Sequence, residues 1–174
     1  SFIDDQDLYF EKLNPKNGAE YLSSSGYKQF STQKKLIKVK NNPTLSFLAK
    51  RTAKRVIIPH ELYRMQSIVP QDFLVSLAWT GFKKNDTTLE TFLKLMSAKK
   101  VEDFKAKMPQ NNSFNLILVI ADETEVNSLF IGNTPKRKKE NQTKGQMITP
   151  GWKTENQWGL ELKREMYPLV LSNK

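Results

Sequence analysis

The side chains that most often carry out enzyme chemistry are scarce in this sequence. It contains one histidine, His60, and no cysteine, so thiol nucleophiles, disulfides and thiolate metal ligands are excluded. A lone histidine does not make a His-based metal site, and as a general base it would need a partner that the sequence does not indicate. We therefore interpret His60 as an ordinary residue of a loop or short helix. The sequence contains neither a Gly-rich phosphate loop nor a Gly-x-Ser-x-Gly elbow, so it does not match most enzyme classes that are identified by a common motif.

Charged side chains gather at two places. Asp4, Asp5 and Asp7 stand near the N-terminus, where they suggest either a cation site or solvated acids. The run Lys136-Arg137-Lys138-Lys139 is the one dense basic cluster, and the other lysine pairs are scattered among acids although the formal net charge is +10. No aromatic stacking set or recognised nucleic-acid module accompanies the charge. We interpret it as solvated surface and expect no nucleic-acid partner.

The elements that must position these residues follow from the apolar pattern. With 174 residues, 38% of them hydrophobic, the chain suits one domain or a piece of one, and no apolar run is long enough to span a bilayer. Alternation and buried runs predict strands, with turns at residues 14–18 and 41–43. The predicted strands cover residues 7–11, 35–40 and 44–48, each with one face buried, then 72–82, buried on both sides, and 114–122 and 126–131.

Two helices are predicted between the last two groups of strands. Thr87 and Glu90 have the spacing of a capping box, and Leu89, Phe92, Leu93 and Met96 then recur at helical spacing. A second amphipathic segment, 101–108, ends before Pro109. We interpret the apolar residues of both helices as core packing. Near the C-terminus, Trp152 and Trp158 beside Gly and Pro predict a tight loop pinned by buried indoles.

The order of these segments, with the residues that mark them, resembles the penicillin acylase family of N-terminal-nucleophile hydrolases. The likeness runs nearly from end to end. Its last third reproduces the family's spacing of Pro-x-Arg, Pro-Gly-Trp and Trp-x-Gly closely, although one residue is missing between Trp158 and Gly159. The matching segments are Asp7-Leu8-Tyr9-Phe10-Glu11, Ile37-Lys38-Val39-Lys40, Ala78-Trp79-Thr80, 88–93, Ala121-Asp122, 132–139, Pro150-Gly151-Trp152 and Trp158-Gly159.

The resemblance implies an α+β fold: part of a four-layer αββα sandwich of mostly antiparallel strands, with a helical hairpin near 87–108. Residues 1–174 would be an internal fragment of a single such domain, from the β subunit. The implied reaction is hydrolysis of an N-acyl amide bond by an N-terminal nucleophile whose own α-amino group serves as base. Ser1 does not match that nucleophile, because the family's residue precedes an Asn and a Trp and lies well upstream of the Asp-Leu-Tyr strand. The nucleophile is therefore expected outside this chain.

Two site residues are implied by the resemblance. The family stabilises the oxyanion with an Asn side-chain amide, and Asn115 is the best match, although it stands seven residues before Asp122 instead of five. A shift of two keeps the same strand face; the alternative is a polar residue at a strand start. Arg137 corresponds to the Pro-x-Arg arginine and is assigned to the acyl or leaving-group side, the alternative being a solvated member of the basic cluster.

Departures from the family pattern leave two interpretations open. The family's Thr-x-His-Gly-Pro-Val-Ile loop, close to a structural calcium site, is replaced here by residues 52–58 without His, Gly or Pro. We therefore expect no cofactor and no calcium. The chain is either part of an active amidohydrolase or a catalytically inactive structural subunit of a larger assembly. Its expected partners are the remaining segments or subunits of the same protein. The family implies a periplasmic or secreted location, and an organellar subunit is the alternative.

Overall fold

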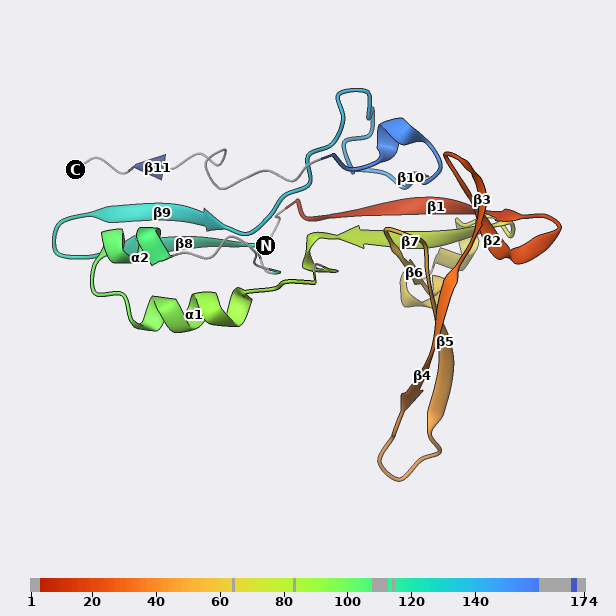
Figure 1. The fold of residues 1–174 in the computed structure, drawn as a ribbon, viewed down its shortest axis with the longest axis horizontal. Helices are drawn as coiled ribbons and strands as arrows, with labels where there is room; N and C mark the ends of the chain where they lie inside the picture. Colours follow the sequence, from red (N-terminus) through yellow and green to blue (C-terminus); the bar gives the residue numbers. More distant parts are fainter. Residues whose placement is uncertain are drawn as a thin grey trace. The chain divides into compact units, whose positions relative to one another are not determined.

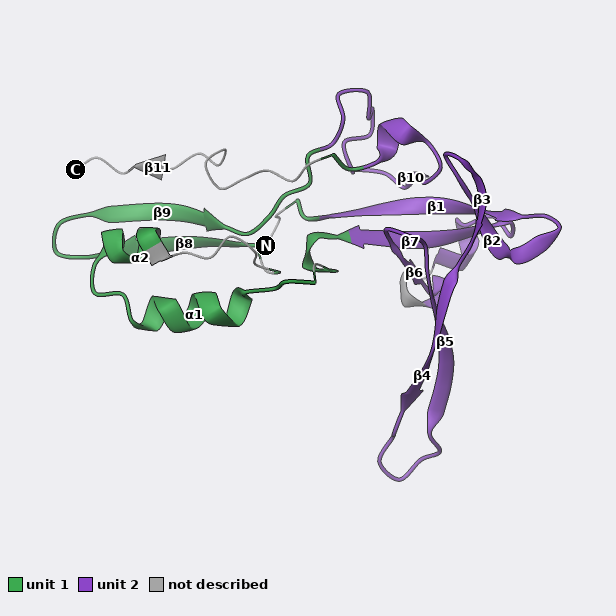
Figure 2. Cartoon of the chain, in the orientation of Figure 1, with its two compact units in different colours: residues 1–5, 79–136, 158–174 green, residues 6–78, 137–157 purple. Residues whose placement is uncertain are grey.

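The fold was obtained as a computed structural model that describes residues 4–63, 65–82, 84–107, 113, 115–159 and 170–171. The chain divides into two compact units (Figure 2). Unit 1 comprises residues 1–5, 79–136 and 158–174, and unit 2 comprises residues 6–78 and 137–157. Residues 1–3, including Ser1, lie outside the described residues, as do Met108, Pro109 and Phe114.

Unit 2 is built on one sheet, which in the described part of the chain has eight strands in the order β3-β2-β1-β7-β6-β5-β4, with β10 paired to β1 (Figure 1). The paired registers are antiparallel except for that of β1 with β10. The strands are β1 Gln6–Asn14, β2 Asn17–Ser23, β3 Gly26–Gln29, β4 Ser31–Ile37, β5 Leu45–Arg51, β6 Val56–Ile58, β7 Phe73–Trp79 and β10 Thr149–Pro150.

The apolar core of unit 2 lies under β1, β6 and β7. Ile58, Met65, Val69 and Val75 are buried there, and Leu8, Phe10, Phe73 and Leu77 pack against them half-buried. The 3-10 helices η1 (His60–Tyr63) and η2 (Met65–Ser67) bring Met65 onto this core. The central strand β7 was predicted to run to residue 82; it ends at Trp79, and the 3-10 helix η3 (Thr80–Phe82) follows.

The β4–β5 hairpin differs from its prediction. Strands were expected over 35–40 and 44–48 with one face buried. The observed β4 begins four residues earlier and ends three earlier, and β5 begins one residue later and ends three later. Every residue of β4 is exposed. The shift arises because seven cross-strand pairs between Ser31/Arg51 and Ile37/Leu45 set the register, and the predicted turn at 41–43 occupies the tip. Most of this ribbon is exposed on both faces, and only Ala49 and Lys50 of β5 are half-buried.

Unit 1 stacks two short helices on a sheet. Within its described residues the sheet has three strands in the order β11-β9-β8 (Figure 1). Phe104, Leu129 and Ile131 form a buried cluster between the helices and the sheet. The elements are α1 Thr88–Met96, α2 Val101–Lys107, β8 Leu116–Ala121, β9 Val126–Ile131 and β11 Val170–Leu171. The helical hairpin near 87–108 is therefore confirmed, with Met108 outside the described residues.

Helix α1 corrects two predictions. The capping box is wrong: Thr87 makes no side-chain cap hydrogen bond, and Asp86 Oδ1 instead accepts from the backbone N–H of Thr88 at 3.0 Å. The apolar stripe was expected to pack in the core, yet four of its side chains are exposed in this structure. These are Leu89, Phe92, Leu93 and Met96. Periodicity identifies the apolar face of a helix but not whether a neighbouring element of the same chain covers it.

The tail loop confirms the predicted packing in part. Trp152 is half-buried, and its ring lies 6.0 Å from that of Phe73 between centroids. Trp158 is half-buried as well. Along the chain, the 3-10 helix η4 (Thr154–Asn156) follows Trp152 and precedes Trp158. In the described part of the chain no helix has the length and apolar character that a membrane crossing requires.

Candidate functional site

Three buried side chains that carry polar groups lie on one face of β1. Because alternate residues of a strand point to the same side, Asp7, Tyr9 and Glu11 share a face, and all three are buried. The other face carries Leu8 and Phe10, which belong to the apolar core. Strand β1 thus packs one face, half-buried, against hydrocarbon and buries the other among charged and polar groups.

Glu11 is completely buried and pairs with Arg55, which arrives from the loop before β6. The guanidinium Nε lies 2.7 Å from Oε1 of Glu11, and Ser76 Oγ donates to the same oxygen at 2.6 Å. Burial raises the pKa of the Glu11 carboxyl, while Arg55 and Ser76 oppose that shift. The partners are therefore needed to hold a charge at a position from which water is excluded.

Gly151 explains why the Pro-Gly-Trp element lies beside this ion pair. Its carbonyl oxygen accepts a hydrogen bond from Arg55 Nη2 at 3.0 Å. A Cβ on residue 151 would lie 2.8 Å from that nitrogen and 2.8 Å from Oε2 of Glu11. The glycine is thus required for the close approach of backbone to the ion pair.

Asp7 forms a second ion pair, with Arg137. Nη2 and Nε of the guanidinium lie 2.6 Å and 2.9 Å from the two carboxylate oxygens, an arrangement that is bidentate. The Arg137 side chain is only 8% exposed. Its interpretation as a solvated member of the basic cluster is therefore wrong, although Lys136, Lys138 and Lys139 are exposed as expected.

Tyr9 lies between the two ion pairs along β1. Its hydroxyl donates to the backbone oxygen of Asn156 at 3.0 Å, and the Arg55 guanidinium stacks 4.3 Å from the centre of its ring. Burial, together with the neighbouring Asp7, raises the pKa of the phenol well above its usual range. Tyr9 is therefore neutral and acts as a fixed donor.

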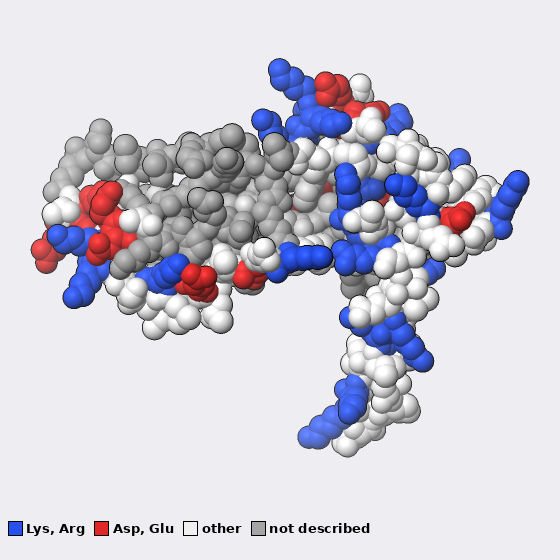
Figure 3. Space-filling model, viewed as in Figure 1, with Lys and Arg blue, Asp and Glu red and all other residues white. Residues whose placement is uncertain are grey.

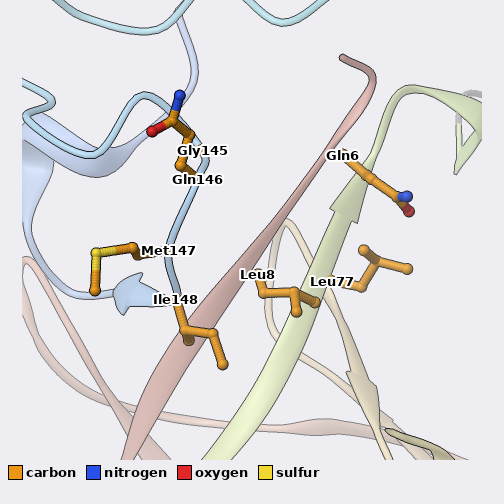
Figure 4. Close-up of a pocket in the computed structure, with 7 residues that line it drawn as sticks. All are labelled: Gln6, Leu8, Leu77, Gly145, Gln146, Met147 and Ile148. Atoms are coloured by element: carbon orange, nitrogen blue, oxygen red, sulfur yellow. The ribbon is translucent and has the colours of Figure 1, made fainter. Parts of the chain in front are cut away.

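A pocket opens beside the start of β1. Its volume is about 330 Å³, and Figure 4 shows that Leu8 and Leu77 come from neighbouring strands and that residues 145–148 come from the segment before β10. The walls are mostly apolar, and two glutamine side chains supply the polar groups. The lining residues are Gln6, Leu8, Leu77, Gly145, Gln146, Met147 and Ile148. A cavity of this size and lining could admit a small apolar group.

Asn115, the predicted oxyanion donor, is buried in unit 1 just before β8. Its side-chain amide pairs with the backbone of Asn133: Nδ2 donates to the carbonyl at 3.0 Å and Oδ1 accepts from the N–H at 2.7 Å. Gly132, with φ of 134°, leaves the space that Asn115 occupies, because a Cβ there would overlap the amide. Asn115 and Arg137 belong to different units.

The acids near the N-terminus do not assemble into a cation site. Asp5 accepts from the indole of Trp79 at 3.2 Å, and Asp7 is paired with Arg137. Among the residues that the structure describes, no group of three or more His, Asp or Glu could hold a metal ion. In the altered loop, Arg55 places a guanidinium against Glu11, so the described residues there do not fit a calcium ion.

Sequence reasoning missed Glu11, Arg55 and Ser76 as a connected group. One signal was available: Asp7, Tyr9 and Glu11 recur at every second residue, as expected for one face of a strand. The partners gave no signal, because Arg55 lies 44 residues from Glu11 along the chain and Ser76 lies 65. His60 begins η1, as a loop or short-helix residue was expected to.

Comparison with solved structures defines the class of fold. The chain superposes on a thermostable penicillin G acylase from Alcaligenes faecalis with a TM-score of 0.79 and 16% identity. The match covers 98% of this chain and 29% of that one. The fold is therefore a mostly antiparallel β structure with two short helices that corresponds to part of a penicillin acylase.

The family follows from the sequence itself. The penicillin amidase family model matches residues 1–172, so the chain belongs to the penicillin amidase family. No curated protein matches the sequence. The chain spans less than a third of the acylase that it resembles.

Proposed function

We propose that this chain is a scaffold-forming part of an acylase-type amidohydrolase that cleaves an N-acyl amide bond. In this proposal the nucleophile comes from polypeptide outside these residues, and Asn115 donates a hydrogen bond to the oxyanion. The observation that carries the proposal is the fixed geometry of the Asn115 amide, within a chain that matches the family over residues 1–172.

The Asn115 amide has the properties that an oxyanion donor requires. An amide nitrogen carries two hydrogens, and the bond to the Asn133 carbonyl uses one of them. The second bond, from the Asn133 N–H to Oδ1, fixes the plane of the amide. A donor held in this way pays little reorganisation when negative charge develops on the substrate oxygen.

The open face of the unit 1 sheet supports a larger sandwich. One side of β8 and β9 packs on the helices through Leu118, Ile120 and Leu129. The other side exposes Ile117, Val119 and Val126, which are 66%, 72% and 47% exposed. An apolar sheet face of this kind is usually covered by another layer. We propose a second sheet there, which would complete an αββα sandwich in which residues 1–174 form part of one domain.

Arg137 is proposed to shape the substrate side of the site. Its bidentate pairing with Asp7 holds the guanidinium in one position. Such a residue would act by fixing the walls around the acyl or leaving group, so its replacement should raise KM more than it lowers kcat.

A second candidate is a catalytically inactive structural subunit. The observation that favours it is that the Asn115 amide already joins the start of β8 to the segment after β9, a purely structural task. The altered loop around Arg55 supports the same alternative. In this case the acylase scaffold persists for assembly and the chemistry is lost.

The test uses the full-length protein encoded by the natural gene and a chromogenic N-acyl arylamide. Asn115→Ala should lower kcat by about 10²- to 10³-fold with little change in KM. Asn85→Ala, at an exposed position of the same unit, is the matched control and should leave kcat unchanged. Thermal unfolding of both variants separates loss of chemistry from loss of fold.

One result would overturn the enzymatic proposal, and another would overturn the role given to Asn115. If mass spectrometry finds no processed N-terminal Ser or Cys and the protein releases no amine, the inactive subunit is the better description. If Asn115→Ala retains full activity, the oxyanion donor is a different residue.

A further inference from the structure

The β4–β5 hairpin, residues 31–51, forms a basic arm. It carries five lysines and Arg51, and the sequence contains no Asp or Glu from Tyr21 to His60. Figure 3 shows Lys and Arg along the arm, with no acidic side chain among them. Much of the net charge of the chain therefore comes from one hairpin.

The arm also exposes apolar side chains on both of its faces. Leu36, Leu45, Leu48 and Phe47 are 65%, 58%, 54% and 50% exposed. Directly opposed residues share a face, so the pairs Ile37/Leu45 and Lys35/Phe47 lie on one side and Leu36/Ser46 and Lys34/Leu48 on the other. Each face thus mixes large apolar side chains with lysine.

Strand β4 also ends the sheet. It is the last strand in the order of the described sheet and pairs only with β5 within it. An isolated two-stranded ribbon is marginally stable in water, and an open edge invites another chain. The arm therefore lacks a covering layer in the described part of the chain.

The charge and the apolar side chains of the arm limit which kinds of surface could cover it. A membrane surface would bury one face only, and the tip, residues 38–44, carries two lysines and Val39 as its one large apolar side chain. Nucleic acid would match the charge but not the exposed aliphatic and aromatic side chains that are spread over two faces. A second copy of the arm would set lysines against lysines. A protein surface that is both acidic and apolar satisfies the charge and the apolar area together.

We propose that the basic arm inserts into an acidic, partly apolar groove of the same acylase-type protein, formed by polypeptide outside these 174 residues. This inference rests on the proposed function, because the matched acylase chain extends well beyond the 29% that this chain covers. In the groove, apolar side chains on both faces are buried and the lysines pair with carboxylates.

Carbodiimide cross-linking of the full-length protein tests the proposal directly. The reagent joins a lysine amine to a carboxylate without a spacer, and the arm has no carboxylate of its own. We expect links from Lys34, Lys35 or Lys50 to Asp or Glu residues outside the 174-residue segment. Mixing isotope-labelled with unlabelled protein distinguishes links within one molecule from links between copies.

Variants of the arm provide the second measurement. Lys34→Glu/Lys35→Glu and Leu45→Ser/Phe47→Ser should each speed amide exchange of residues 31–51 on the order of tenfold or more, because they remove charge pairing or apolar burial. Lys28→Glu and Tyr27→Ser, at exposed positions of β3 in the same unit, are the matched controls and should leave the arm unchanged.

Several results would overturn the proposal. These are links confined to residues 1–174, links between isotopically different copies, unprotected arm amides in the intact protein, or arm-dependent binding to anionic vesicles or nucleic acid. None of these measurements depends on amidase activity. An inactive protein with the expected links refutes the proposed function alone, and an active protein without them refutes the arm alone.

Discussion

Arg55 and Arg137 each neutralise one carboxylate on the buried face of β1. Both pairs are almost fully enclosed, with side-chain exposures of 7% and 0% for Arg55 and Glu11, and of 8% and 4% for Arg137 and Asp7. Removing water from a charge costs several kcal/mol, which a partner offsets only when the geometry is good. The two arginines therefore make it possible for an acid-bearing strand to lie inside unit 2.

Arg55→Met should destabilise the protein strongly. The substitution keeps most of the side-chain volume but leaves the Glu11 carboxylate buried without its cation, at a cost of ~3–5 kcal/mol. The Glu11→Gln/Arg55→Met double variant should recover part of that loss. Urea unfolding gives the free energies. Lys153→Met, which breaks an exposed pair with Glu155 at 3.8 Å, should change stability by less than about 1 kcal/mol.

Gly151→Ala should weaken the same group of residues through crowding. The added Cβ would stand 2.8 Å from both Arg55 Nη2 and Glu11 Oε2, and overpacking of this kind costs about 1–3 kcal/mol. Gly18→Ala is the control, since nothing lies within 4 Å of its added Cβ. Equal thermal unfolding of the two variants would contradict the role assigned to Gly151.

At the scale of elements, Asp122 ties the β8–β9 turn to helix α2. Its carboxylate accepts from the hydroxyl of Thr124 at 2.7 Å and from the N–H of Val101, the first residue of α2, at 3.0 Å. Hydrogen bonds from Thr124, then from the backbone of Val101, hold the pKa of Asp122 far below its ordinary value of 3.8. The charged carboxylate is thus favoured in the folded state.

This lowered pKa predicts an acid-dependent contribution to stability. A group whose pKa falls on folding stabilises the fold above its unfolded pKa, and the contribution is lost as the pH falls toward the folded value. Asp122→Asn should therefore destabilise unit 1 near neutral pH, and its difference from the wild type should shrink below about pH 4. Glu123→Gln, at an exposed neighbour, is the control. The measurement is amide exchange of α2 across this pH range. A difference between Asp122→Asn and the wild type that does not change with pH would contradict the prediction.

The elements also show how far sequence reasoning reaches. Local patterns were sufficient for β1, β9, the turn at 41–43 and the helical hairpin, because alternation and helical spacing are written in neighbouring residues. They failed for the environment of α1 and β4–β5, where apolar residues face outward. They also could not pair Glu11 with Arg55, since that contact depends on the arrangement of strands and not on spacing. Asn115 was named as a site residue, but its bonds to Asn133 required the structure.

At the scale of the whole molecule, apolar surface and positive charge are distributed unevenly. Unit 1 leaves one helix face and one sheet face open, and unit 2 leaves its basic arm uncovered within the described residues. Scattered apolar residues are normal on protein surfaces, but grouped ones mark interfaces. These surfaces, together with the partial coverage of the acylase chain, support a role for the chain as a piece of a larger fold.

The chain divides into two units, each with its own buried cluster. This division predicts that partial unfolding of one unit leaves the other unit folded. Under native conditions Arg55→Met should speed amide exchange in residues 6–78 and 137–157, whereas Asp122→Asn should speed it in residues 79–136. If residues 1–174 belong to one domain, as proposed, strong denaturant should still unfold both regions in a single transition. Native-state hydrogen exchange with increasing urea measures both behaviours in the full-length protein. Two separate transitions would refute the single domain, and equal acceleration in both units by either variant would refute the division, because openings of this size would then involve the whole chain.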